Sequence, residues 1–340
     1  PLLIAGLLGV VAVLRVLSSS LTAGFVIKEF TWYQYLFTQF RVIWLYVRLF
    51  FLPVGLNADY DLTASKNILD QGAVLGLVGL LIAAAVAWRY RREFPLASFG
   101  FFGMLLLLAP TSSVVPIRDV AVERRLYLPF VCLVLIALDL LRRWKVSRPV
   151  LAGLLAALTA GAAVATHQRS QVWSNSLALW EDTLAKSPHN TRALFQLAHA
   201  QWESGQCDKA ATTYERVSAS GKYPDDIPIN WSLALECAGK PDDAVAKLQQ
   251  AAARKPSAHI FATIGMVRAK QGRPGEALDA LATAEKLDPA FDMTYVYRGN
   301  VYLSQNNIAG AESEFNRALS INGSNQPARE ALVRLRRIPR

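Results

Sequence analysis

The sequence predicts an all-α protein in which a multi-pass bundle of transmembrane helices precedes an α-solenoid of helical repeats. Two observations lead to this fold class: apolar segments follow one another through residues 1–170, and a period of 33 to 34 residues runs through residues 171–340. The composition agrees with it. Of the 340 residues, 53% are hydrophobic and only 18% are charged, whereas soluble proteins carry about 25% charged residues.

The first half contains a series of apolar segments, and such a series in one half-chain is typical of a membrane protein rather than of buried core helices. The chain opens at Pro1 without the basic region of a signal peptide, so we expect it to be part of a longer protein. The first apolar stretch reaches Leu17, and the others lie at 36–52, 73–88, 96–110, 126–141 and 150–166. The segment 36–52 carries Arg41 and Arg48 on one helical face, so it either spans the bilayer or lies in the interface as an amphipathic helix.

Basic residues lie in two of the loops between these segments. Residues 1–170 hold 16 of the 36 Lys and Arg but only 8 of the 26 Asp and Glu, so most of the net charge of +10 lies there. Short loops rich in Lys and Arg stay in the cytoplasm, which assigns the loops 89–92 and 142–148 to that side. The loops 53–72 and 111–125 and everything after residue 166 are then outside. We therefore expect a plasma-membrane or inner-membrane protein that contacts lipids and binds no nucleic acid.

The second half has an internal repeat. The small residues Ala210, Ala244, Ala277 and Ala311 recur at intervals of 34, 33 and 34 residues, with a turn-forming residue five positions before each. Small residues let two antiparallel helices approach closely, Gly turns the chain between them, and Pro stops the second helix. The pattern closely resembles the tetratricopeptide (TPR) repeat. It predicts a half repeat, four repeats and a capping helix at about 174–190, 191–224, 225–257, 258–291, 292–325 and 326–337.

TPR arrays bind partners through the concave face formed by the first helix of each repeat, so the resemblance implies a groove for a protein or peptide there. The side chains on this register mix aromatic, aliphatic and polar types without a cluster of Lys and Arg, which favours an extended, partly apolar segment as ligand. Several of them also suit ordinary packing between repeats. The expected groove residues are Phe195, His199, Trp202, Ile229, Leu233, Glu236, Ala262, Met266, Val296, Asn300 and Leu303.

The loop 111–125 is the best candidate for chemistry in the first half. It holds Arg118, Arg124 and Arg125 on the face that we expect to be non-cytoplasmic, where charges without an orientation role mark functional sites. Arg forms bidentate contacts with phosphate oxygens. The cluster therefore predicts binding of a lipid-linked phosphate, and the alternative is pairing of these Arg side chains with neighbouring acidic residues or with lipid headgroups.

This loop and the next helix contain the motif Ser112-Ser-x-x-Pro-Ile-x-Asp…Glu123-Arg-x-Leu-Tyr-Leu-Pro129. With membrane helices and TPR repeats after it, the motif resembles the transmembrane-and-TPR-containing protein family. The resemblance implies a GT-C-type glycosyltransferase, like the protein O-mannosyltransferases of animals, that moves a sugar from a polyprenyl-phosphate donor to a protein acceptor presented by the TPR repeats. It implies that the donor phosphate is bound by Arg118, Glu123, Arg124, Arg125 and Tyr127, with Arg124 as the inward-facing Arg.

The acidic catalytic residue of GT-C enzymes usually lies in the first outer loop, so the resemblance puts it upstream of this chain. Asp59 and Asp61 form an acidic pair on the expected outer face, which either belongs to a site or is part of an Asx-rich turn at 57–61. We expect no cofactor and no metal in this part of the protein, and nothing requires a disulfide between the distant Cys207 and Cys237. The alternative to an enzyme is a non-catalytic, membrane-anchored TPR scaffold for protein–protein interaction.

Overall fold

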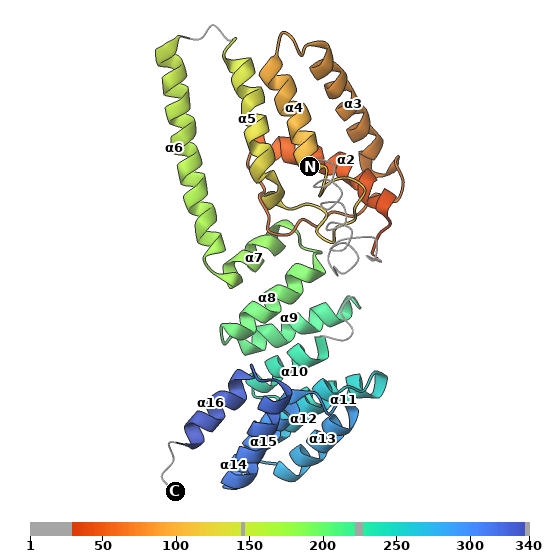
Figure 1. The fold of residues 1–340 in the computed structure, drawn as a ribbon, viewed down its shortest axis with the longest axis vertical. Coiled ribbons are helices and arrows are strands. Elements are labelled where there is room, and N and C mark those ends of the chain that lie inside the picture. Colours follow the sequence, from red (N-terminus) through yellow and green to blue (C-terminus); the bar gives the residue numbers. More distant parts are fainter. Residues whose placement is uncertain (1–28, 144–146, 222–226, 337–340) are drawn as a thin grey trace, which may run out of the picture. The chain divides into compact units, whose positions relative to one another are not determined.

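The computed structural model describes residues 29–143, 147–221 and 227–336, and every element of regular structure in these ranges is a helix (Figure 1). The all-α part of the predicted fold class is confirmed. The chain divides into two compact units, Pro1–Asn190 and Thr191–Arg340. The composition predicts this division after residue 170, whereas in the structure the helix that continues past residue 170 and the helix after it group with the N-terminal unit.

Six α-helices and two short 3-10 helices form the described part of the N-terminal unit. The 3-10 helices, Asp70–Gly72 and Glu123–Leu126, lead into α3 and α5. The α-helices are α2 (Trp32–Phe51), α3 (Ala73–Arg89), α4 (Pro95–Leu108), α5 (Tyr127–Leu141), α6 (Arg148–Trp173) and α7 (Ser176–Lys186). Proline stands in the first turn of both α4 and α6, where its missing N–H has no helical partner to lose.

The first of these helices, α2, is amphipathic and buries one face. Thr31 and Gln34 form a capping box at its start, and the buried side chains that follow are three or four residues apart, as in Tyr35, Val42 and Tyr46. In Figure 1, α2 runs across α3, α4 and α5 rather than parallel to them. A β-carbon on Gly76 of α3 would collide with the backbone of α2, so glycine is required at this crossing.

Two helices among the described residues are long and apolar enough to cross a membrane, Asp70–Arg89 and Pro149–Trp173. By contrast, α4 and α5 have 14 and 15 residues, fewer than the about 20 that a span usually needs. The helices described therefore support fewer crossings than the multi-pass bundle that the sequence predicts. The apolar stretch that reaches Leu17 lies outside the described residues.

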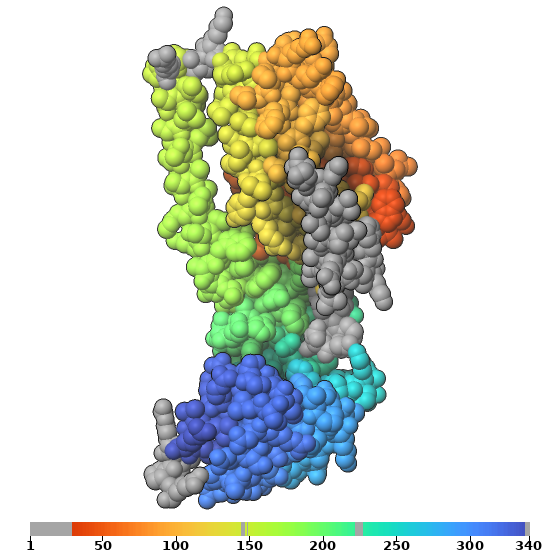
Figure 2. Space-filling view, viewed as in Figure 1, coloured from red at the N-terminus to blue at the C-terminus, as the bar shows by residue number. Residues whose placement is uncertain are grey.

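The surface of these helices is apolar. Leu158 of α6 is 68% exposed, and Leu154 and Val164 on the same helix are also more than half exposed. In Figure 2 most of α6 stands apart from α5. Exposed apolar side chains continue on α3 and α4, for example at Leu75 and Leu106. The described helices of this unit therefore leave a large apolar surface uncovered.

The described residues of the C-terminal unit form four helix pairs and a last helix. At the turn within each pair, Gly205, Gly239, Gly272 and Asn306 adopt positive φ angles of 61° to 73°, a region that Gly and Asn enter most easily. These are the turn formers expected from the period. The pairs are α8 (Thr191–Glu203) with α9 (Cys207–Ala219), α10 (Ile227–Cys237) with α11 (Pro241–Arg254), α12 (Ala258–Lys270) with α13 (Pro274–Leu287), and α14 (Asp292–Ser304) with α15 (Ile308–Ile321), followed by α16 (Gln326–Leu335).

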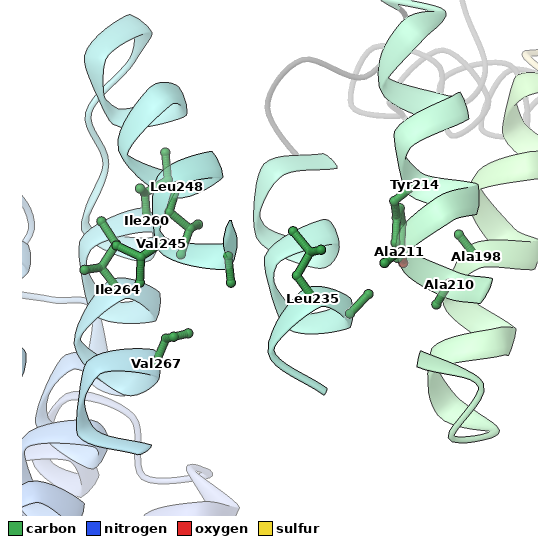
Figure 3. Close-up of a cluster of buried hydrophobic side chains, with 12 residues drawn as sticks. Ala198, Ala210, Ala211, Tyr214, Leu235, Val245, Leu248, Ile260, Ile264 and Val267 are labelled. Atoms are coloured by element: carbon green, nitrogen blue, oxygen red, sulfur yellow. The ribbon is translucent and has the colours of Figure 1, made fainter. Parts of the chain in front are cut away.

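Small residues hold the paired helices close together. Ala210, Ala244, Ala277 and Ala311 are all fully buried. A β-carbon on Gly265 would lie 2.6 Å from Cγ of Leu281, which is closer than any ordinary carbon–carbon contact. The five consecutive helices α8 to α12 share one core. Figure 3 shows side chains of this core, which include Ala198, Ala210, Ala211, Tyr214, Leu235, Val245, Leu248, Ile260, Ile264 and Val267.

A disulfide joins Cys207 to Cys237, whose Cα atoms are 5.5 Å apart. It links the first residue of α9 to the last residue of α10, and so ties the first helix pair to the second. No sequence pattern requires this bond. Their separation of 30 residues is slightly less than one repeat. This spacing brings the start of α9, the second helix of its pair, beside the end of α10, the first helix of the following pair.

Candidate functional site

Glu123, the first residue of the motif's second part, holds the loop 53–61 in place. One of its carboxylate oxygens accepts hydrogen bonds from the backbone N–H of Asn57 at 2.6 Å and from the Tyr60 hydroxyl at 2.8 Å. Burial raises the pKa of Tyr60, and the neighbouring Glu123 carboxylate raises it further, so this hydroxyl remains a donor at physiological pH. Glu123 is therefore occupied by the protein's own groups.

Arg125 points toward α2 and stabilises the loop before it. Its guanidinium donates to the Tyr35 hydroxyl at 3.2 Å, to the backbone oxygen of Val120 at 3.1 Å and to that of Asp119. The amide of Gln39 donates to the same Val120 oxygen. Three carbonyl and hydroxyl oxygens thus satisfy Arg125 from inside the unit, and its contacts are those of a structural residue.

Arg124 faces outward. Its side chain is 70% exposed and pairs with the Asp119 carboxylate at 2.7 Å. The expectation that Arg124 is the inward Arg is therefore wrong, since adjacent positions at the entrance to a helix point in different directions and Arg125 takes the inward one. Arg118 is half exposed and pairs with Glu29 at 3.0 Å, and Tyr127 is 80% exposed. The five residues predicted to bind a donor phosphate thus separate into two that are held inside and three on the surface.

The same loop 53–61 is also fastened to α7. The side-chain amide of Asn57 donates to the Ser187 hydroxyl at 2.8 Å, and the Lys186 ammonium donates to the backbone oxygen of Leu56 at 2.8 Å. Asp59 is buried whereas Asp61 is exposed, so the two carboxylates occupy different environments. The sequence pattern pointed to the Asp residues and not to Tyr60 or Ser187. The Asx-rich turn at 57–61 contains Tyr60, whereas no pattern indicates Ser187.

A charged cluster joins α6 to α7. The Asp182 carboxylate accepts from Arg169 and from Lys186, each at 2.7 Å. Burial alone would raise the pKa of Asp182, but these hydrogen bonds and charges outweigh it and hold the pKa below its ordinary value. Within the described ranges no three His, Cys, Asp or Glu side chains lie close enough together to hold a metal ion.

In the C-terminal unit, most of the expected groove residues keep part of their side chains accessible. The groove assignment is wrong for Ala262 and Val296, because both side chains are buried in packing between helices. The His199 ring lies edge-on to Trp202 and 3.5 Å from the Glu203 carboxylate. The partly accessible residues on α8, α10, α12 and α14 are Phe195, His199, Trp202, Ile229, Leu233, Glu236, Met266 and Leu303, and Asn300 is exposed.

Comparison with known proteins identifies the repeat. Residues 262–327 match the family model described as tetratricopeptide repeat. No curated protein sequence matches the chain.

Three TPR structures are similar in part. TTC0263, a thermophilic TPR protein of Thermus thermophilus, is 20% identical over 53% of this chain and 97% of that one, with a TM-score of 0.43. YrrB, a TPR protein with an unusual peptide-binding site, is 20% identical over 51% of this chain and 86% of that one, with a TM-score of 0.35. MamA is 17% identical over 50% of this chain and 95% of that one, with a TM-score of 0.37. The matched residues, the period and the paired helices lead to one conclusion: the C-terminal unit is an array of tetratricopeptide repeats.

Proposed function

We propose that this protein is a membrane-anchored scaffold whose TPR array binds an extended segment of a partner protein on the non-cytoplasmic side of the membrane. The observation that carries the proposal is the accessible surface of the first helices. Phe195, Trp202, Leu233 and Met266 are only partly buried there, although Phe195, Trp202 and Met266 also pack against the core. Accessible aromatic and aliphatic side chains on a rigid scaffold are the usual anchors for a protein partner.

The character of these side chains supports a partly apolar ligand. His199 and Asn300 supply hydrogen-bonding groups beside the apolar ones, while Glu236 is already paired with Lys270 at 2.8 Å. Such a surface suits a segment in which apolar side chains alternate with polar ones. Membrane attachment is supported by the exposed apolar surface of α3, α4 and α6, which matches the apolar environment of a bilayer.

Two independent observations support a non-cytoplasmic array. The basic residues of the loop 89–92 follow the apolar helix α3, as expected for a loop that stays inside. The Cys207–Cys237 disulfide is a bond that persists in oxidising compartments and is rare in the cytosol. Charge in one unit and cysteine pairing in the other therefore favour the same side.

Photo-crosslinking tests the proposal. A photoreactive residue at Leu233 is expected to capture a protein partner in native membranes, whereas one at Lys209, exposed on α9, serves as the matched control. Leu233→Asp should abolish capture from a neighbouring photoreactive site at Met266. Equal capture at Leu233 and Lys209 would argue against a groove. A reporter fused after Arg340 should be active only when exported, and cytoplasmic activity would contradict the topology.

The second candidate is GT-C-type transfer of a sugar from a polyprenyl-phosphate donor, with the catalytic acidic residue supplied from upstream. It is favoured by the motif at 112–129 and by the exposure of Arg118 and Arg124, which leaves both guanidinium groups accessible to a phosphate. Arg124→Lys keeps the charge but loses the planar fork, so donor-dependent transfer by the full-length protein should fall about tenfold or more. Unchanged transfer would leave the scaffold as the function.

A further inference from the structure

The N-terminal unit contains an apolar cavity of about 550 Å³ along one side of α4, which we call the α4 groove. Its lining residues on α4 recur every three or four positions from Pro95 to Leu107, so they follow one face of the helix over nearly its whole length. Trp88 and Arg91 line it from the end of α3 and the loop that follows, and Cys132 lines it from α5. Its volume is within the range of about 300–1,000 Å³ that ligand pockets occupy.

The α4 side of this groove suits a single long acyl chain. Among its apolar side chains, Phe99 is 66% exposed and Leu106 is 74% exposed. A helical rise of 1.5 Å per residue gives the groove a length of about 18 Å, close to the about 15 Å of one leaflet of a bilayer's hydrocarbon core. The Ser98 hydroxyl already donates to the backbone oxygen of Ala87 at 2.8 Å, so its donor is used within the protein.

Arg91 adds a cation to this apolar groove. Its Nη1 donates to the backbone oxygen of Trp88 at 2.8 Å, and its Cζ lies 4.2 Å from the centre of the Trp88 ring. These contacts orient the guanidinium and also occupy the ring, so the apolar part of a ligand has to lie along α4. Arg91 is exposed and makes no ion pair within the described ranges. A guanidinium has five N–H groups, and those that remain can bind the paired oxygens of a phosphate.

The charge around Arg91 is positive. The loop 89–94 contains three Arg and one Glu, and that Glu does not line the groove. Asp139, buried beside the start of α4, is paired with the two Arg side chains that follow α5. Residues 1–28 and 144–146, which lie outside the described ranges, contain no Asp or Glu. An anionic group at Arg91 therefore meets an excess of cations.

We propose that the α4 groove binds one anionic phospholipid of the cytoplasmic leaflet, with its phosphate at Arg91 and an acyl chain along α4 as far as Leu106. The inference rests on the proposed function, because it takes the N-terminal unit to lie in the membrane with the loop 89–92 inside, and it extends that function by naming the lipid that this unit selects. Acyl chains are as apolar as the groove and supply little preference of their own. The cation supplies the preference, as basic pockets between helices on the cytoplasmic side do for anionic headgroups.

Lipid photo-crosslinking with the full chain in nanodiscs tests the inference. The nanodiscs contain equal amounts of phosphatidylglycerol and phosphatidylcholine with the same acyl chains, and mass spectrometry identifies the lipid attached to a photoreactive residue at Leu106. Phosphatidylglycerol should exceed phosphatidylcholine among the adducts about three- to tenfold, between the values for exposed ion pairs and charge-assisted hydrogen bonds. The matched site is Leu75 of α3, which is also 74% exposed and does not line the groove, so its adducts should follow the composition of the nanodisc.

Two variants test whether Arg91 supplies the preference. Arg91→Gln should reduce the lipid ratio at Leu106 to the ratio at Leu75, whereas Arg92→Gln, which removes the same charge from the same loop but outside the groove, should change it by less than about twofold. Equal ratios at Leu106 and Leu75 in the parent, or an equal loss in both variants, overturn the inference. Adducts of Leu106 with a protein segment, of a partner or of this chain, overturn it as well, because a helix then fills the groove.

The failure of this inference can be distinguished from the failure of the proposed function. If a carbonate wash removes the full chain from membranes, both the anchorage and the lipid site are wrong. If the chain stays in the membrane but Leu106 and Leu75 give the same lipid ratio, only the lipid site is wrong. If Leu233 captures no partner while Leu106 keeps its preference for phosphatidylglycerol, the scaffold is wrong and the lipid site is supported.

Discussion

Removing the Cys207–Cys237 disulfide should destabilise the TPR array by about 3–4 kcal/mol. In the chain-entropy model, a cross-link raises stability by restricting the unfolded chain, and the effect grows with the length of the closed loop. The separation here is 30 residues, which corresponds to about 3.6 kcal/mol at 25 °C. Neither Cys is fully buried, so replacing both with Ser leaves no cavity and isolates the contribution of the bond.

The assay is thermal unfolding of the full chain followed by circular dichroism. For a unit of this size, 1 kcal/mol corresponds to about 2–4 °C in Tm, so the double variant Cys207→Ser/Cys237→Ser should unfold about 7–14 °C lower. Treatment of the parent with a phosphine reductant should give the same decrease. The double variant itself should not respond to the reductant, which controls for the free Cys132.

Two results would refute this reasoning. If the parent, the reduced parent and the double variant unfold at one temperature, the bond does not restrain the unfolded chain. If both thiols react with a maleimide reagent in membranes taken from the cells that make the protein, before any reductant is added, then the bond is absent there. The second result would also remove the support that the disulfide lends to a non-cytoplasmic array.

Three further outcomes are expected. Gly265→Ala puts a β-carbon 2.6 Å from Leu281 and should cost about 1–3 kcal/mol of array stability by overpacking, whereas Gly275→Ala, which meets no atom within 4 Å, should be neutral or stabilising in the same melts. Glu123→Gln weakens the charge-assisted hydrogen bonds that hold loop 53–61, so limited proteolysis should cut that loop faster. An unchanged rate of cleavage would contradict the role of Glu123 in holding the loop. Burial alone would raise the pKa of Glu285, but the hydrogen bond and charge of Arg298 outweigh burial and hold the pKa below its ordinary value of 4.5. The parent should therefore be more stable than Glu285→Gln in melts above pH 4.5, and this difference in stability should shrink as the pH falls below 4.5.

Much of the C-terminal unit followed from local patterns. The positions of Gly205, Gly239 and Gly272 located the turns, because only a few residue types enter the left-handed region at low cost. The alanines of the period located the close helix contacts for the same steric reason. The expected capping helix 326–337 corresponds to α16, Gln326–Leu335. Ala262 and Val296 were misassigned to the groove because a register identifies a helix position and not how much of it the neighbouring helix covers.

The sequence by itself determined the all-helical fold, the repeat and its turns, since these depend on residues a few positions apart. Only the tertiary structure decided which of Arg124 and Arg125 faces inward, that Glu123 binds a loop 66 residues away, and that Cys207 meets Cys237. Each of these depends on which distant segments pack together, and the packing depends on the combined burial of many side chains. A motif identifies the residues that are available for a site, whereas their partners in the folded chain determine which of them remain free to act.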